Sequence, residues 1–498
     1  MIHCNDGQRS NGLNRMFRTA AVGLVWSNAF AFAVASGLPV VAAEVKEQSI
    51  EERPADDVNH IQLTQFKVPK PGEAPAPLPK RLTYQYGYGS ESDITYRTNP
   101  DLNKRVKDDF LILTPQLNAN VTYRPTDWLE TTLEMILERE TPAQEEDVIP
   151  LPDGGTKFKE RRRFSLLVDQ LFVTIKDFTA PFEFTVGRRN HEDERHWLYD
   201  TSMDIASTSL KLGKFRAEAF VGREVLVHGD LLKREKRDRI NTYVFYADYR
   251  GIEDIKLAAY TFFREDRARR EGRPLLMGLR SQGMPSDTFS YWIELAHMRG
   301  RHESLRRYFS AYAIDVGATY RFLDFPLKPN ITLGFAFGTG DDNRSNNRSN
   351  EFRQTGLQSN EVRFAGVSEF KGYGEALDPE LSNLKIFTVG LGFRPAPNFS
   401  VDFVYHRYRL HEIADEVRNS ALTAQMNQID TRLSKDVGSA IDMVFGFRNL
   451  FGIRRLGLDF RTGWFFPEKA FHRNEGDEDN PNIRHGANGF TIVAKFWW

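Results

Sequence analysis

Hydrophobic and polar residues alternate along most of the chain beyond residue 80. In "QLNANVTYR" every second residue is apolar or aromatic: Leu117, Ala119, Val121 and Tyr123. The stretch "WLETTLEMILE" repeats the alternation after "PTD", with glutamates opposite leucines. Successive side chains of a β-strand point to opposite faces of the sheet. The two stretches therefore predict an antiparallel hairpin with one apolar face and one polar face.

The same pattern recurs to the end of the sequence. "YAIDVGATYRF" alternates around Asp315, "AIDMVFGF" around Asp442 and "LGLDFRTGW" around Asp459. The stretch "TIVAKFWW" places four residues on one apolar face: Ile492, Ala494, Phe496 and Trp498. We expect this strand to end on an aromatic side chain in an interfacial belt, as bacterial outer-membrane barrels typically do.

Two architectures satisfy this alternation. A soluble sandwich hides its apolar faces between two sheets, whereas a transmembrane barrel turns them to lipid and its polar faces to a lumen. Aromatic residues gather near predicted strand ends, as in "LTYQYGY" and "TYRPTDW", and short turns alternate with long polar loops such as "GTGDDNRSNNRSNEFRQTGLQSN". One sandwich of more than about 400 residues would exceed the usual size of a domain. The sequence therefore predicts an all-β fold, a transmembrane antiparallel β-barrel in the outer membrane of a Gram-negative bacterium.

The predicted barrel occupies residues 81–498. At roughly 22–25 residues for each strand and its connection, this length gives about 16–20 strands, with short periplasmic turns and long external loops. A barrel of that width leaves an aqueous lumen.

Two further segments precede the barrel. Residues 1–43 read as a signal peptide, because an apolar stretch follows Arg18 and the small residues Val41-Ala42-Ala43 resemble a cleavage site. Residues 44–80 lack aliphatic periodicity and are rich in proline, which predicts a flexible Pro-rich periplasmic arm, either a spacer or a ligand for a partner. The chain has a single cysteine, Cys4, within the predicted signal peptide. A thiolate nucleophile or thiolate metal site is therefore not expected in the mature protein.

Composition excludes other classes. The formal net charge is -1, so no bulk basic field suggests a nucleic-acid partner. Beyond the N-terminus no apolar run approaches the roughly 18 residues that a spanning helix needs. Aromatic residues make up 12% of the chain, which suits aromatic girdles better than an ordinary core.

One part of the sequence resembles a known family. The strings "EFRQTGLQSNEVRFAG", "YGEALDPELSNLKIFTVGLGF" and "FSVDFVYHRY" resemble the alginate export family of outer-membrane porins, most tightly over residues 352–408, and "FTVGRRNHEDERHWLYDTS" is similar to another part of it. The resemblance implies an eighteen-stranded monomeric barrel that passes an acidic polysaccharide, with long loops partly closing its ends and arginines lining its lumen. Guanidinium groups bind carboxylates bidentately. Exposed pairs are each worth at most about 1 kcal/mol, so such a lining holds a polymer without trapping it.

The resemblance also implies a set of lumen residues. Positions of family arginines fall here on Asp169, Glu361, Glu369 and Asp459, while Arg461 is kept. With Arg189, Arg353 and Arg363 these form the expected pore-lining, polymer-contacting set. Strand parity alone also points acids inward, among them Glu130, Glu134, Glu138, Asp315, Asp402 and Asp442, opposite bases such as Arg124, Arg321, Arg448 and Lys495. We therefore expect a mixed or net acidic lumen, in which any one charge could equally brace the wall.

The leading functional hypothesis is a channel that exports an exopolysaccharide, alginate or an alginate-like polymer. The alternative is a general or small-solute diffusion porin. An outer-membrane lipase or deacylase would need a serine or histidine at the lipid-facing rim, and we identify none. We therefore expect no enzyme activity, no catalytic residue and no cofactor. The expected partners are the polysaccharide, outer-membrane lipid, the barrel-assembly machinery and periplasmic export proteins.

Metal sites are not predicted either. In "NHEDERH", His191 and His196 are five residues apart and share a face on neither a strand nor a helix. The loop "TGDDN" offers Asp341 and Asp342, which are either solvated or ligands for Ca²⁺.

Overall fold

The computed structural model describes residues 83–102, 109–141, 148–150, 156–158, 163–176, 181–233, 239–266, 272–302, 306–343, 345–427, 433–471 and 487–497. All of them lie in one compact unit, Pro71–Trp498. The predicted signal peptide, Cys4, the predicted arm and Trp498 lie outside the described residues. No helix in these ranges is long and apolar enough to cross a membrane.

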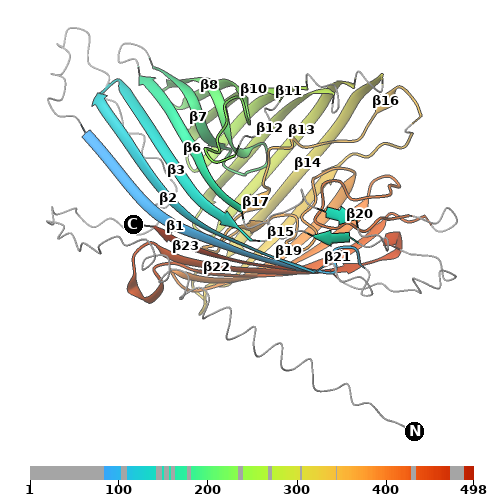
Figure 1. Cartoon of the computed structure of the whole chain (residues 1–498). Coiled ribbons are helices and arrows are strands. Elements are labelled where there is room, and N and C mark those ends of the chain that lie inside the picture. The colour runs from blue at the N-terminus through green and yellow to red at the C-terminus, as the bar shows by residue number, and fades with distance from the viewer. Residues whose placement is uncertain are drawn as a thin grey trace. The chain divides into compact units, whose positions relative to one another are not determined.

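Eighteen of the described strands form a ring in which each strand pairs with the next one along the chain (Figure 1). They are β1 (Thr83–Thr98), β2 (Phe110–Thr126), β3 (Leu129–Glu140), β6 (Arg163–Lys176), β7 (Phe182–Glu192), β8 (Asp200–Leu212), β9 (Phe215–Arg223), β10 (Ile240–Ile252), β11 (Ile255–Asp266), β12 (Arg273–Ser286), β13 (Phe289–His302), β14 (Arg307–Arg321), β15 (Asn330–Gly338), β19 (Leu384–Ala396), β20 (Phe399–Leu410), β21 (Asp436–Phe447), β22 (Leu456–Pro467) and β23 (Ala487–Trp497).

The first and last strands close the ring. β1 pairs antiparallel with β2 on one side and with β23 on the other, so Ile94 lies opposite both Leu113 and Ile492. A closed barrel leaves no edge strand, and every strand can satisfy its backbone groups within the sheet, as lipid requires. The predicted transmembrane β-barrel is confirmed, with eighteen strands inside the expected range.

The faces of the strands follow the alternation in the sequence. On β14 the side chain of Ile314 is 37% exposed, whereas the next residue, Asp315, is 5% exposed. On β21 Ile441 is 42% exposed and Asp442 is fully buried. The apolar side chains therefore lie on the outer face, where lipid would cover them, and the acids point inward.

Connections differ in length between the two rims of the barrel. At one rim the links are short, such as residues 213–214 between β8 and β9 and residues 397–398 between β19 and β20. At the other rim they are long, and the longest runs over residues 339–383. This asymmetry is the predicted pattern of short periplasmic turns and long external loops.

The long loop contains three short strands. β16 (Arg348–Ser349) adds to β14 in parallel, and β17 (Glu361–Val362) pairs with β18 (Phe370–Lys371) as a small hairpin. Elsewhere the chain forms β4 (Val148–Pro150), β5 (Thr156–Phe158) and the 3₁₀ helices η2 (Leu450–Gly452) and η3 (Lys469–Phe471).

The hydrophobic core lies where this loop meets the inner wall. Phe370 of the hairpin packs with Val404 of β20 and Val444 of β21, all three buried. A larger buried cluster joins Trp197, from the loop between β7 and β8, to Phe352 of the long loop. The loops therefore fold into the barrel and narrow its lumen.

Candidate functional site: the constricted lumen

Residues 193–199, which link β7 to β8, form a tight turn inside the barrel. Oδ1 of Asp193 accepts hydrogen bonds from the backbone N–H groups of Trp197, at 2.7 Å, and Leu198, at 3.1 Å. A short acidic side chain that caps its own turn in this way fixes the backbone locally. The turn can therefore hold its charged side chains in defined positions.

A buried arginine ties this turn to the barrel wall. Arg280 of β12 is fully buried at its side chain, with Nη1 2.5 Å from Oδ2 of Asp193 and Nε 2.5 Å from Oε2 of Glu294. The hydroxyl of Tyr260 donates to the other oxygen of Glu294 at 2.6 Å. Buried charges need ion-pair partners and hydrogen bonds. This cluster supplies the ion pairs, while Nη2 of Arg280 makes no hydrogen bond within the described residues.

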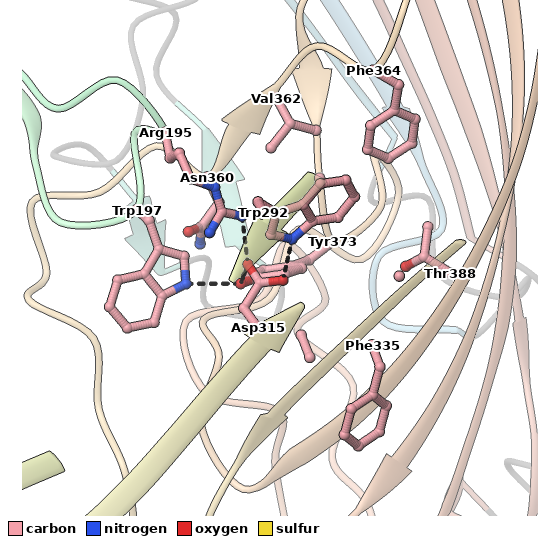
Figure 2. A pocket seen from close by; sticks show the side chains of 13 residues that line it. Arg195, Trp197, Trp292, Asp315, Phe335, Asn360, Val362, Phe364, Tyr373 and Thr388 are labelled. Carbon is pink, nitrogen blue, oxygen red and sulfur yellow. Dashed lines mark hydrogen bonds and ion pairs between the residues drawn. The ribbon is translucent and has the colours of Figure 1, made fainter. Parts of the chain in front are cut away.

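A second arginine continues the cluster. Arg195 lies 2.8 Å from Oδ2 of Asp315 and 3.4 Å from Oε2 of Glu294. Asp315 also accepts hydrogen bonds from Trp292 Nε1, at 2.8 Å, and from the hydroxyl of Tyr373, at 3.0 Å. These side chains converge on one carboxylate in Figure 2.

Tyr373 belongs to the long loop and joins it to the turn. Its hydroxyl accepts a hydrogen bond from Trp197 Nε1 at 2.9 Å while it donates to Asp315. Burial, reinforced by the charge of Asp315, raises the pKa of Tyr373 well above its usual value of 10.0. The phenol therefore stays protonated and remains a donor. A pocket beside it is lined by Val362, Phe364 and Thr388, among other residues (Figure 2).

Four of the expected lumen residues meet at the hairpin of β17 and β18. Arg461 of β22 contacts Oε1 of Glu361 at 2.9 Å, and Arg363 contacts Oε1 of Glu369 at 3.0 Å. Arg461 also lies 3.8 Å from Oε1 of Glu375, which is buried. The two arginines are thus each paired with one glutamate of the long loop.

Asp459 lies next to this group. It contacts Arg448 at 2.5 Å and accepts a hydrogen bond from Ser368 of the loop between β17 and β18. Arg448 in turn donates to the carbonyl of Val367 at 2.6 Å. These contacts hold the loop between β17 and β18 against β22.

The other expected residues contact different parts of the wall. Asp169 accepts a hydrogen bond from Ser202 at 2.6 Å. Arg189 lies over the ring of Phe172, and Arg353 lies over the ring of Phe309, at 5.5 and 5.6 Å from the ring centres.

Sequence reasoning missed the cluster around Arg280. Arg280 and Glu294 stand in otherwise apolar stretches, "LLMGLRSQ" and "SYWIELAHM". An isolated charge in such a strand is costly unless it is paired, and that was the available signal. Its partners on the loop at 193–195 could not be assigned from strand parity.

One group of potential metal ligands lies among the described residues. Ligand atoms of His196, Glu361 and Glu369 all lie within 4.8 Å of one another.

A closed eighteen-stranded antiparallel barrel, apolar outside and charged inside, is the architecture of an outer-membrane channel. The sequence model of the alginate export family matches residues 79–483, and the chain belongs to this family. The predicted family and the predicted outer-membrane location in a Gram-negative bacterium are confirmed.

Curated relatives match over shorter stretches. The alginate production protein AlgE of Azotobacter vinelandii is 25% identical over 182 residues, 34% of this chain and 36% of the relative. AlgE of Pseudomonas aeruginosa is 28% identical over 136 residues, 27% of this chain and 26% of the relative. The matched stretches thus span little more than a third of these relatives at most.

Solved outer-membrane proteins share the fold. OprD of Pseudomonas aeruginosa superposes with a TM-score of 0.51 at 10% identity, covering 83% of this chain and 93% of OprD. OccAB2 of Acinetobacter baumannii gives a TM-score of 0.50 at 12% identity, covering 83% of this chain and 98% of OccAB2. At these identities the similarity shows the barrel fold alone.

Proposed function

We propose that this protein exports an acidic exopolysaccharide, alginate or an alginate-like polymer, through the outer membrane. The observation that carries the proposal is the family match across residues 79–483, which includes the wall strands from β1 to β22 and the long loop over residues 339–383. The curated relatives are named as alginate production proteins, which supports the same substrate class. We infer that the channel acts by binding and guiding the polymer and carries out no catalysis.

We further propose that the charged residues at the β17–β18 hairpin meet the polymer. Arg363 and Arg461 each contact a glutamate, so their guanidinium groups exchange carboxylate partners when a uronate passes. Exchange at the Arg363–Glu369 pair costs little, because its side chains are 37% and 34% exposed and solvent-accessible pairs are worth at most about 1 kcal/mol. The Arg461–Glu361 pair, with side chains 12% and 24% exposed, exchanges less readily. A lining of paired charges therefore favours movement over tight binding. The remaining members of the proposed lining are Asp169, Arg189, Arg353, Glu361, Glu369 and Asp459.

The paired charges also support a proposal about ion selectivity. The resemblance to the family implies that four acids, Asp169, Glu361, Glu369 and Asp459, stand where the family has arginines. Fixed charges in a narrow pore concentrate counter-ions. A reconstituted channel should be cation-selective or nearly unselective, which reversal potentials across a KCl gradient measure. Strong anion selectivity would mean that the arginines dominate the constriction.

We propose that the barrel works as a monomer, is inserted by the barrel-assembly machinery and receives its cargo from periplasmic export proteins. The test of function is deletion of the gene in its own host. Polymer in the medium should fall, with recovery on complementation, while uptake of small solutes stays unchanged. Unchanged polymer release with slower solute uptake would instead support a diffusion porin.

A further inference from the structure

His196, Glu361 and Glu369 bring one imidazole and two carboxylates together in the lumen. Their ligand atoms lie within 4.8 Å of one another, close enough to contact a single ion. His196 comes from the turn between β7 and β8, whereas both glutamates come from the long loop between β15 and β19. An ion bound here would therefore join two separate segments of the constriction.

The backbone holds the two segments in place without an ion. The N–H of His196 donates to the carbonyl of Asp193 at 2.8 Å, and the carbonyl of His196 accepts from the N–H of Asn360 at 3.0 Å. His196 has a φ of 49°, in the left-handed region that few side chains adopt. Asn360 directly precedes Glu361, so this hydrogen bond sets the histidine beside the first glutamate. The donor groups are thus arranged before any ion binds, which lowers the entropic cost of binding.

The imidazole of His196 has the environment of a metal ligand. Its Nδ1 is buried and makes no hydrogen bond within the described part of the chain, and it lies 3.4 Å from Oδ2 of Asp200. Metal-binding histidines commonly have a carboxylate beside one ring nitrogen, which orients the ring and leaves the other nitrogen for the ion. Asp200, the first residue of β8, is placed to act in this way.

Each of the two glutamates has an arginine partner. Arg461 contacts two carboxylates, because its Nη1 lies 2.9 Å from Oε1 of Glu361 and 3.8 Å from Oε1 of Glu375. Arg363 contacts Oε1 of Glu369 at 3.0 Å and is 37% exposed at its side chain, so water weakens that pair. A carboxylate has two oxygens and can contact a guanidinium and a metal ion at once. Each glutamate can therefore offer an oxygen to an ion while it keeps its arginine partner.

We propose that these three residues bind a divalent transition-metal ion and that the ion closes the constriction by occupying the lumen between the turn and the hairpin. One imidazole with two carboxylates suits Zn²⁺, which takes nitrogen and oxygen ligands and completes its shell with water. Binding of the ion does not depend on the proposed export function. The effect of the bound ion on transport through the lumen, in contrast, rests on the proposed export function.

Calorimetric titration with ZnCl₂ tests the site on the full mature chain, folded in detergent and freed of metal with EDTA. Two variants remove ligands: Glu369→Gln, and His196→Asn, since asparagine tolerates a positive φ. We expect each variant to bind Zn²⁺ at least about ten-fold more weakly. His411→Ala is the control, because His411 lies 3.8 Å from a carboxylate of Glu412 outside the cluster.

The outcomes separate the site from other zinc binding. Weaker binding by both ligand variants with an unchanged His411→Ala control supports the proposal. Absence of saturable binding, or binding by His196→Asn as tight as that of the wild type, would overturn it. Heat-modifiable migration on gels shows that each variant has folded into a barrel.

Single-channel recording tests the consequence for the lumen. Zn²⁺ should lower the conductance of the wild-type channel and EDTA should restore it, while His196→Asn should not respond. Each variant is compared with its own conductance in EDTA. Zinc binding at the cluster without any change in conductance would contradict the proposed closure, whereas a barrel that conducts no ions at all would contradict the proposed channel.

Discussion

Replacing Arg280 with methionine removes a buried cation while keeping a long apolar side chain. In the wild type this guanidinium contacts Asp193 of the lumen turn and Glu294 of β13, each at 2.5 Å. All three side chains are buried, with exposures of 0% to 2%. The substitution therefore leaves two carboxylates with less compensation in a place that water hardly reaches.

The free-energy cost of the substitution depends on which partners Glu294 and Asp193 keep. Breaking a buried ion pair by removing one partner costs about 3–5 kcal/mol. Glu294 keeps the hydroxyl of Tyr260 at 2.6 Å and Arg195 at 3.4 Å, so its loss is the smaller. Asp193 keeps the two backbone N–H groups of its own turn. We expect a cost near the lower end, about 3 kcal/mol, which is roughly a hundred-fold in an equilibrium constant.

This cost should appear as local opening of the turn, because the strands of the barrel keep their own hydrogen bonds. Hydrogen exchange of the amides of Trp197 and Leu198 reports that opening, since both donate to Asp193. In the Arg280→Met protein these amides should exchange about a hundred times faster. The control is Arg407→Met, which removes a pair with Asp436 that is partly exposed and should cost at most about 1 kcal/mol.

A double variant tests the electrostatic reasoning. If the cost comes from the uncompensated charge of Asp193, adding Asp193→Asn to Arg280→Met should restore part of the protection, because the amide oxygen can still accept from the turn. Unchanged exchange in Arg280→Met, or a double variant that loses the sum of two independent costs, would refute the argument.

Further predictions concern packing and pH. Gly317→Ala should lower the free energy of unfolding by about 1–3 kcal/mol, because a Cβ there would lie 2.2 Å from the ring of Trp292, whereas Gly334→Ala, at 3.4 Å from the same ring, should be tolerated. Denaturant midpoints compare the two, and equal losses would contradict the clash. Burial raises the pKa of Glu375 above 4.5, opposed by the charge of Arg461, so its stabilising contribution is complete below pH 4.5 and is lost as the pH rises through the raised pKa. Wild type should therefore lose stability relative to Glu375→Gln as the pH rises above 4.5, and parallel pH curves would contradict this.

The wall of the barrel could be predicted from the sequence because each strand follows a local rule. A period of two sends Ile314 outward and Asp315 inward whatever the rest of the chain does. Their exposures of 37% and 5% agree with that rule. The length of the chain then bounds the number of strands.

The contents of the lumen could not be predicted in the same way. The loop of residues 339–383 has no periodicity, so nothing local places Glu361 against Arg461, its ion-pair partner on β22. Likewise, the spacing of the two histidines in "NHEDERH" argues against a metal site within that segment, but the glutamates near His196 come from a different loop. Contacts between loops depend on the closed wall that brings them together.

The duration of current blocks by uronate oligomers of increasing length tests the central claim most directly. Single channels are reconstituted in planar bilayers, and oligomers of defined length are added to one side, with neutral glycans of equal length as the comparison. If the lumen carries an acidic polymer end to end, the duration of each block should grow with the length of the uronate chain, because a longer chain takes longer to thread. Block durations that do not depend on length, or no interaction with uronates at all, would contradict export of such a polymer through this barrel.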